Sequence, residues 1–68
     1  MIVFKKDHQR NDYEVIDQSG KCHGFIWPYD DYWVCRVGER PAENYETYEL
    51  AVTRAKELVN EALQKTAS

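Results

Sequence analysis

The sequence predicts an α+β domain in which a small antiparallel sheet of three to four strands packs on one C-terminal helix. Short runs rich in β-branched and aromatic residues fill the first half of the chain and alternate with turn residues. The last third of the chain repeats apolar residues at steps of three and four, which is typical of an amphipathic helix. The strands are joined by short connections, and these favour an antiparallel meander.

We expect the strands at residues 2–6, 13–18, 21–27 and 32–37. The first run is β-branched and aromatic, and the second roughly alternates between apolar and polar residues. Ser19 and Gly20 form a turn signal before the third strand. Pro28 is expected to end that strand because proline cannot donate to a ladder. Gly38 and Pro41 stop the fourth strand.

The helix is expected over residues 47–65. Thr47 is a suitable N-cap, and Glu49 lies in the first turn, where the helix dipole favours an acid. The apolar positions form one stripe, which we expect to face the sheet: Tyr48, Ala51, Val52, Ala55, Leu58, Val59, Ala62 and Leu63. The positions away from this stripe are expected to be solvated: Arg54, Glu57 and Glu61.

The stretch GFIWPYDDYWVC, residues 24–35, contains both tryptophans of the chain. If the loop at 28–31 joins Trp27 directly to Tyr32, this hairpin has two unlike faces. One face is small and apolar: Cys22, Gly24, Ile26, Trp33, Cys35 and Val37. The other is aromatic with a polar edge: His23, Phe25, Trp27, Tyr32, Val34 and Arg36. We expect the helix on the first face, which Gly24 would let it approach closely, and solvent or a partner on the second. The alternative is that the aromatic residues simply build the core of a small domain.

Length and charge narrow the function classes. A single domain of 68 residues buries only about 60% of the surface of its unfolded chain, so its core gives little stability. We therefore consider self-association, which would bury more surface. Twelve acidic residues outweigh nine basic ones, whereas nucleic-acid-binding domains usually carry a basic excess. The apolar runs are too short for a membrane span or a secretory signal. We therefore expect a cytoplasmic protein, complete from Met1 and encoded as a small independent gene product.

The chain offers little for metal or catalytic chemistry. The cysteines and histidines lack zinc-site spacing, and neighbouring strand residues such as Cys22 and His23 point to opposite faces. A disulfide between Cys22 and Cys35 is an alternative to two free thiols. Asp30 and Asp31 suit a turn better than a hydrolytic carboxylate pair. We expect no metal, no cofactor and no enzymatic activity.

The helix start in YETYELAVTRAKELV, with its pattern T-x-E-x-A, resembles that of HicB-type antitoxins, which pair a small sheet with a helix. The order of the elements also resembles the arm-binding domains of phage integrases. That resemblance implies a sheet that binds DNA through basic residues, whereas the predicted sheet here carries Glu14, Asp17, Asp30 and Asp31.

We expect a small protein-binding regulator or inhibitor, of the kind encoded by phages and other mobile elements. It would use an aromatic sheet face and an acidic rim to bind a protein target with a basic surface. The expected partner-binding residues are Phe25, Trp27, Tyr29, Asp30, Asp31, Tyr32, Arg36, Glu39, Glu43 and Tyr45.

Two alternatives stay open. In the first, the aromatic residues stack on the bases of a single-stranded nucleic acid, and basic residues meet its phosphates. The residues for that role would be Phe25, Trp27 and Tyr32 with Lys5, Lys6, Arg10, Lys21 and Arg36. In the second, the aromatic face is a homodimer interface that compensates for the thin core.

Overall fold

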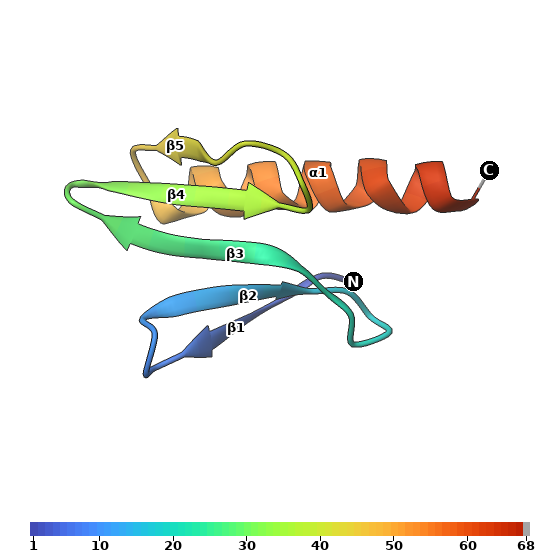
Figure 1. The fold of residues 1–68 in the computed structure, drawn as a ribbon, viewed down its shortest axis with the longest axis horizontal. Coiled ribbons are helices and arrows are strands. Elements are labelled where there is room, and N and C mark those ends of the chain that lie inside the picture. The colour runs from blue at the N-terminus through green and yellow to red at the C-terminus, as the bar shows by residue number, and fades with distance from the viewer. Residues whose placement is uncertain (68) are drawn as a thin grey trace.

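The computed structural model describes residues 1–67, with side chains described through Lys65. Over this range the chain forms five strands and one helix (Figure 1). These elements are β1 (Val3–Asp7), β2 (Asp12–Ile16), β3 (Cys22–Tyr29), β4 (Tyr32–Val37), β5 (Glu43–Tyr45) and α1 (Tyr48–Ala67). The strands pair antiparallel in chain order, β1-β2-β3-β4-β5. The α+β class and the antiparallel meander are confirmed, but the sheet has one strand more than the largest expected number.

The extra strand is β5, which sequence patterns did not indicate. It has three residues, Glu43, Asn44 and Tyr45, and two of them are polar. Its place is set by pairing, because Tyr45 lies opposite Trp33 and Glu43 lies opposite Cys35 on β4. A strand this short is stabilised by its neighbour more than by its own propensity.

The expectation that Pro28 ends the third strand is wrong, because β3 continues through Pro28 to Tyr29. Pro28 pairs with Trp33 on β4, whereas the residue pairs between β2 and β3 end at Tyr13 and Ile26. Pro28 therefore lies beyond the ladder on the β2 side, where its missing N–H costs no hydrogen bond.

The longer strand also changes the register of the hairpin. Asp30 and Asp31 form a two-residue turn, so Tyr29 rather than Trp27 lies opposite Tyr32. Trp27 lies opposite Val34, which shifts the expected pairing by two residues. Side chains alternate between faces with a period of two, so a shift of two leaves the residues from Gly24 to Val37 on their expected faces. A register irregularity between Val15 and Ile16 interrupts this order at the start of β3. His23 bonds to buried Asp17 and borders a hollow with Leu58 of the helix, whereas Cys22 is exposed and borders a hollow with Phe25 and Arg36. The division of the hairpin into an apolar face and an aromatic face is therefore confirmed from Gly24 to Val37, and it was wrong for Cys22 and His23.

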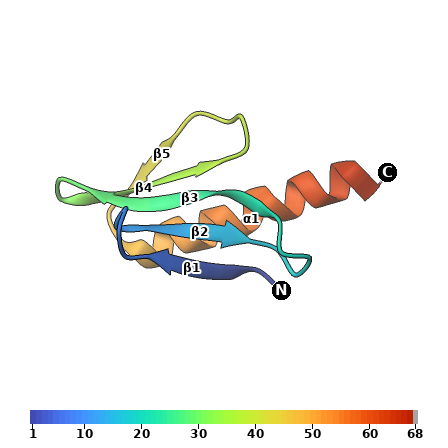
Figure 2. The same cartoon turned by 60° about the horizontal axis from the view of Figure 1, so that its bottom comes forward.

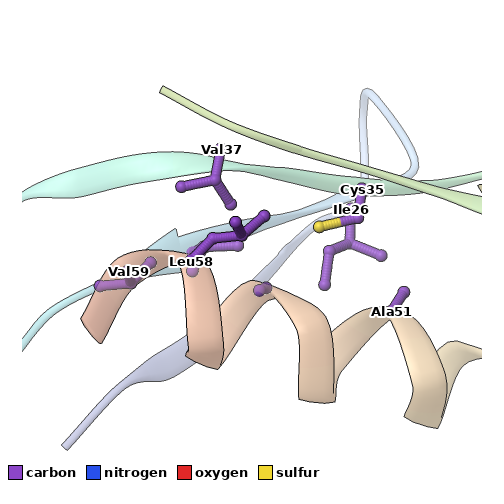
Figure 3. Packing of buried hydrophobic residues seen from close by; sticks show 8 residues of the cluster. Ile26, Cys35, Val37, Ala51, Leu58 and Val59 are labelled. Atoms are coloured by element: carbon purple, nitrogen blue, oxygen red, sulfur yellow. The ribbon is translucent and has the colours of Figure 1, made fainter. Parts of the chain in front are cut away.

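The helix α1 lies on one side of the sheet and packs chiefly on β4 (Figures 1 and 2). Side chains from the small apolar face point toward the helix and meet its stripe (Figure 3). The buried cluster consists of Val15, Ile26, Cys35, Val37, Ala51, Ala55, Leu58 and Val59. Tyr48 also packs on this cluster, within reach of the rings of Tyr13 and Trp33. The core thus sits between the sheet and the helix.

Gly24 has a different partner from the one expected. A Cβ atom at Gly24 would lie 2.0 Å from the carbonyl oxygen of Arg36 and 2.8 Å from Cα of Val37. Both atoms belong to the backbone of β4. Gly24 therefore permits a close approach between two strands, not between the sheet and the helix.

The helix begins where the sequence predicts, but one of its charged side chains, Arg54, is not solvated as expected. Thr47 caps it, since its Oγ1 accepts a hydrogen bond from the backbone N–H of Leu50 at 3.2 Å. Arg54 was expected to be solvated, but its side chain is partly buried. Its Nε donates to Oε1 of Glu43 at 3.0 Å, and its Nη1 donates to Glu57 at 3.1 Å. The first of these bonds ties the helix to β5.

Candidate functional site

The sheet face opposite α1 is the candidate site, and we call it the open face. No element of the described range 1–67 packs on it (Figures 1 and 2). Six side chains of the β3–β4 hairpin form its centre: Phe25, Trp27, Tyr29, Tyr32, Val34 and Arg36. Val34 is buried, Phe25, Trp27 and Tyr32 are half-buried, and Tyr29 is 60% exposed.

The open face has an aromatic centre with a charged border on the β2 side. The guanidinium of Arg10 lies 5.3 Å from the centre of the Phe25 ring, which is within cation–π range. Its Nε donates to Asp12 at 3.1 Å, and its Nη2 donates to Glu14 at 3.1 Å. Nη2 also lies 3.3 Å from a carboxylate oxygen of Asp7. The hydrogen bond to Asp12 is the largest cause of the raised pKa of Arg10.

The turn of the β3–β4 hairpin forms one end of the open face. The rings of Tyr29 and Tyr32 lie 5.7 Å apart, at an angle of 44°. Asp30 adopts a φ of 58°, in the left-handed region that Asp and Asn tolerate better than most residues. Neither Asp30 nor Asp31 has an ion-pair partner within residues 1–67. The turn therefore presents an exposed Tyr29 and a half-buried Tyr32 beside two carboxylates that have no ion-pair partner.

Arg36 lies at the other end of the same face. It is exposed and sits opposite Phe25 across the β3–β4 ladder. The part of the chain that the structure describes offers it no ion-pair partner. A shallow hollow lies between it and the Arg10 group, bordered by Asp12, Phe25 and Trp27. His23 was expected opposite Arg36, but Arg36 pairs with Phe25, and the His23 side chain bonds to Asp17 instead.

The continuous acidic rim expected from the sequence does not form. Glu39 lies in the loop after β4, at the end of the hairpin far from Asp30 and Asp31. Glu43 accepts hydrogen bonds from the hydroxyl of Tyr45 and from Arg54, and these lower its pKa. Glu43 and Tyr45 thus lie on the helix side of the sheet and make internal contacts. The open face unites Phe25, Trp27, Tyr29, Tyr32 and Arg36 with the acids of one turn.

The basic residues named for nucleic-acid binding are also dispersed. Lys6 lies on the helix side, where its Nζ is 4.8 Å from the Tyr13 ring centre and 2.8 Å from Asn11 Oδ1. Lys21 precedes β3 in the loop after β2. Lys5, Arg10 and Arg36 remain on the open face.

Sequence patterns missed a polar cluster in the loop between β2 and β3. Asp17 is buried and accepts hydrogen bonds from the Ser19 hydroxyl at 2.6 Å and from the backbone N–H of Ser19 and Lys21. The Nε2–H of His23 donates to its second oxygen at 2.7 Å. These bonds hold the pKa of Asp17 well below its usual range. The hydrogen bond from the Ser19 hydroxyl lowers it most, and the bond from His23 is the next largest cause. The signal was the run DQSG, typical of an Asp-led turn.

This cluster has the residue types of a hydrolytic triad but not the geometry. The serine hydroxyl donates to the carboxylate, whereas a nucleophile would donate to histidine. The carboxylate also faces the Ser19 and Lys21 backbone N–H groups, which is how an Asp closes a loop. The arrangement therefore orders the β2–β3 connection.

The cysteines and the metal-binding residue types are likewise separate. Cys22 is exposed, Cys35 is buried, and both are free. Burial raises the pKa of the Cys35 thiol to about 11, and the nearby Glu43 adds to this. Among the residues described, no three His, Cys, Asp or Glu side chains come together in a metal-binding group.

Comparison with known proteins gives no family. No family model matches the chain, and neither a curated protein nor a solved structure matches it. In the described range, α1 is not apolar enough to cross a membrane.

Proposed function

We propose that this chain is a small non-enzymatic protein-binding regulator or inhibitor that binds a basic partner surface through its open face. The observation that carries this proposal is the aromatic centre of a sheet face that the helix leaves uncovered. Tyrosine and tryptophan are enriched at protein interfaces because they combine large contact area with a polar group. A partner covering Trp27 would bury apolar surface that this chain by itself leaves half-exposed.

The chemistry of the partner follows from charge. Asp30 and Asp31 are uncompensated at the edge of two tyrosine rings, and the whole chain carries a net charge of −3. Lysine and arginine side chains are attracted both to carboxylates and to the faces of aromatic rings. A cationic segment of a partner protein could therefore place its charges at this turn and its aliphatic carbons on the aromatic centre.

Single-stranded nucleic acid is the alternative occupant. Lys5, Arg10 and Arg36 lie on the open face with the aromatic residues, which is the combination such binding needs. Against it, Arg10 is already bound to three carboxylates. Those carboxylates would repel a phosphate backbone, so we favour a basic protein partner.

A fluorescence titration distinguishes the two occupants. A Trp33→Phe background leaves Trp27 as the sole tryptophan, so its emission reports on the open face. We expect a lysine- and arginine-rich peptide to change this emission at low salt, and the effect to weaken as salt rises. A mixed-sequence single-stranded oligonucleotide should have no effect. A response to the oligonucleotide alone would replace the proposal with the nucleic-acid function, and no response to either would overturn it.

Two variants of equal charge locate the contact. Asp30→Asn with Asp31→Asn neutralises the turn, and Asn tolerates the left-handed conformation at residue 30. Glu39→Gln with Glu49→Gln removes the same charge from a distant loop and from the helix. The first pair should weaken peptide binding and flatten its salt dependence more than the second. Equal losses in both would show general charge attraction and contradict a role for the turn.

A further inference from the structure

We propose that the chain without a target pairs through the open face as a twofold-symmetric homodimer, which a bound target would displace and in which Arg36 of each protomer meets the Tyr29–Tyr32 turn of the other. This inference does not depend on the proposed target, since it concerns two copies of this chain alone. It rests on three features of the open face: its uncovered aromatic centre, its two unpaired charged ends and the spacing between them.

The spacing makes the face complementary to itself. Three cross-strand pairs follow one another along the open side of the hairpin: Phe25 with Arg36, Trp27 with Val34, and Tyr29 with Tyr32. Consecutive pairs are about 6.7 Å apart, because same-face residues are two positions apart along a strand. The Trp27–Val34 pair therefore lies midway between the basic end and the acidic turn.

A twofold axis through that midpoint, in the plane between two facing sheets and perpendicular to the strands, reverses the strand direction. It places Arg36 of one protomer over Tyr29 and Tyr32 of the other, beside the partner's Asp30 and Asp31. The same operation repeats the contact at the other end, as an isologous interface requires. Facing sheets pack about 10 Å apart, a gap that an arginine side chain can bridge.

Charge selects this orientation over the other twofold arrangement. An axis parallel to the strands would bring the two Arg36 side chains to the same level and the two acidic turns to the same level. Like charges would then face each other at both ends, which opposes association. The perpendicular axis pairs each Arg36 with the two carboxylates of the opposing turn.

The thin core supplies the driving force. The buried cluster lies wholly between the sheet and the helix, while Phe25, Trp27 and Tyr32 on the open face stay half-buried in one protomer. A stable interface covers about 800 Å² of each partner, which is about one sixth of the 4918 Å² exposed by this chain. Two Trp27 side chains meeting at the axis would give the interface an aromatic centre of the kind that dominates binding energy.

Sedimentation equilibrium of the purified chain, from micromolar to millimolar concentration, tests the dimer directly. We expect the mass to rise with concentration toward that of two chains. Arg36→Glu should weaken association by about tenfold or more, because both contacts in the dimer become repulsive. Arg36→Lys should largely retain it. Lys56→Glu, which makes the same charge change on the exposed side of the helix, should leave it unaffected.

Mixing two variants gives the most specific test. Arg36→Glu places an acid at the basic end, and Asp30→Asn with Asp31→Arg places a base at the acidic turn. Each variant alone should associate weakly, since its two ends no longer attract each other. Their equimolar mixture should associate as the wild type does, because both contacts of the mixed dimer are attractive. Far-ultraviolet circular dichroism of each variant confirms that it is folded.

Three results would overturn the inference. These are a wild-type chain that stays monomeric at every concentration, association that Arg36→Glu leaves unchanged, and a mixture that stays as dissociated as its components. A monomeric wild type would not affect the peptide titration, which tests the proposed function separately. Failure of the dimer is therefore distinguishable from failure of the proposed function.

Discussion

Replacing Gly24 by alanine should be among the most damaging small changes in this protein. The added Cβ would lie 2.0 Å from the Arg36 carbonyl oxygen and 2.8 Å from Cα of Val37. Both obstacles are backbone atoms of β4, so no side-chain rotation can relieve the contact. The strands β3 and β4 must move apart by about 1 Å to restore a normal contact distance, which disturbs the ladder between Gly24 and Val37.

The cost can be estimated from these contacts. Weakening two ladder hydrogen bonds costs about 1 kcal/mol each, and overpacking typically costs about 1–3 kcal/mol. Alanine recovers about 0.4–1 kcal/mol by restricting the unfolded chain. The net loss is therefore about 3 kcal/mol. A chain of 68 residues has a total stability of about 3–10 kcal/mol, so this one methyl group removes much of it.

Urea unfolding followed by tryptophan fluorescence measures the loss. With a slope of about 1 kcal/mol per molar urea for so short a chain, the midpoint should fall by about 3 M, or the variant should be unfolded from the start. Gly38→Ala is the matched control. Its Cβ would meet nothing within 4 Å, but its φ of 61° is left-handed, so it should cost only about 1 kcal/mol. A Gly24→Ala midpoint equal to the wild type, or above that of Gly38→Ala, would refute the close approach of β3 and β4.

Three further outcomes follow from the same contacts. Iodoacetamide should modify Cys22 in the folded chain at neutral pH and reach Cys35 only after unfolding, since Cys35 is buried with its pKa raised to about 11; mass spectrometry checks this. Thr47→Ala should cost about 1 kcal/mol in urea unfolding because the helix loses its cap, and Thr47→Ser should restore most of it. The lowered pKa of Asp17 stabilises the fold above its unfolded pKa of about 3.9, and this contribution is lost as pH falls toward the folded value. Ser19→Ala should therefore raise the pKa of Asp17 measured by NMR and reduce the pH dependence of stability in acid; an unchanged pKa would contradict the role of the Ser19 hydroxyl.

The faces of the β3–β4 hairpin could be predicted from sequence although its register could not. Pro28 suggested an early end to the strand, and that expectation moved the pairing of Trp27 from Val34 to Tyr32. The expected register was wrong by two residues, and an even shift leaves each side chain on the same face of the sheet. The reason the strand survives Pro28 is that β2 is too short to pair there, and no local pattern reveals the length of a neighbouring strand.

Charge was harder to assign than apolar burial. Arg54 was expected to be solvated and Glu43 to bind a partner, yet the two side chains bind each other between α1 and β5. They are 11 residues apart, and the contact exists only because β5 pairs with β4 beside the helix. The Asp17–His23 pair arises in the same way, because the β2–β3 connection folds back on itself.

The sequence alone determined the periodicities, and with them the α+β class, the helix with its Thr47 cap and the side of the hairpin on which the core forms. Those properties depend on the alternation of residue types within one element, which is local. Only the tertiary structure decided which charges are paired and which remain exposed on the open face. That division depends on how neighbouring strands align and end, so Arg36, Asp30 and Asp31 emerge as unpaired groups at the two ends of the hairpin only once β3 and β4 are in register.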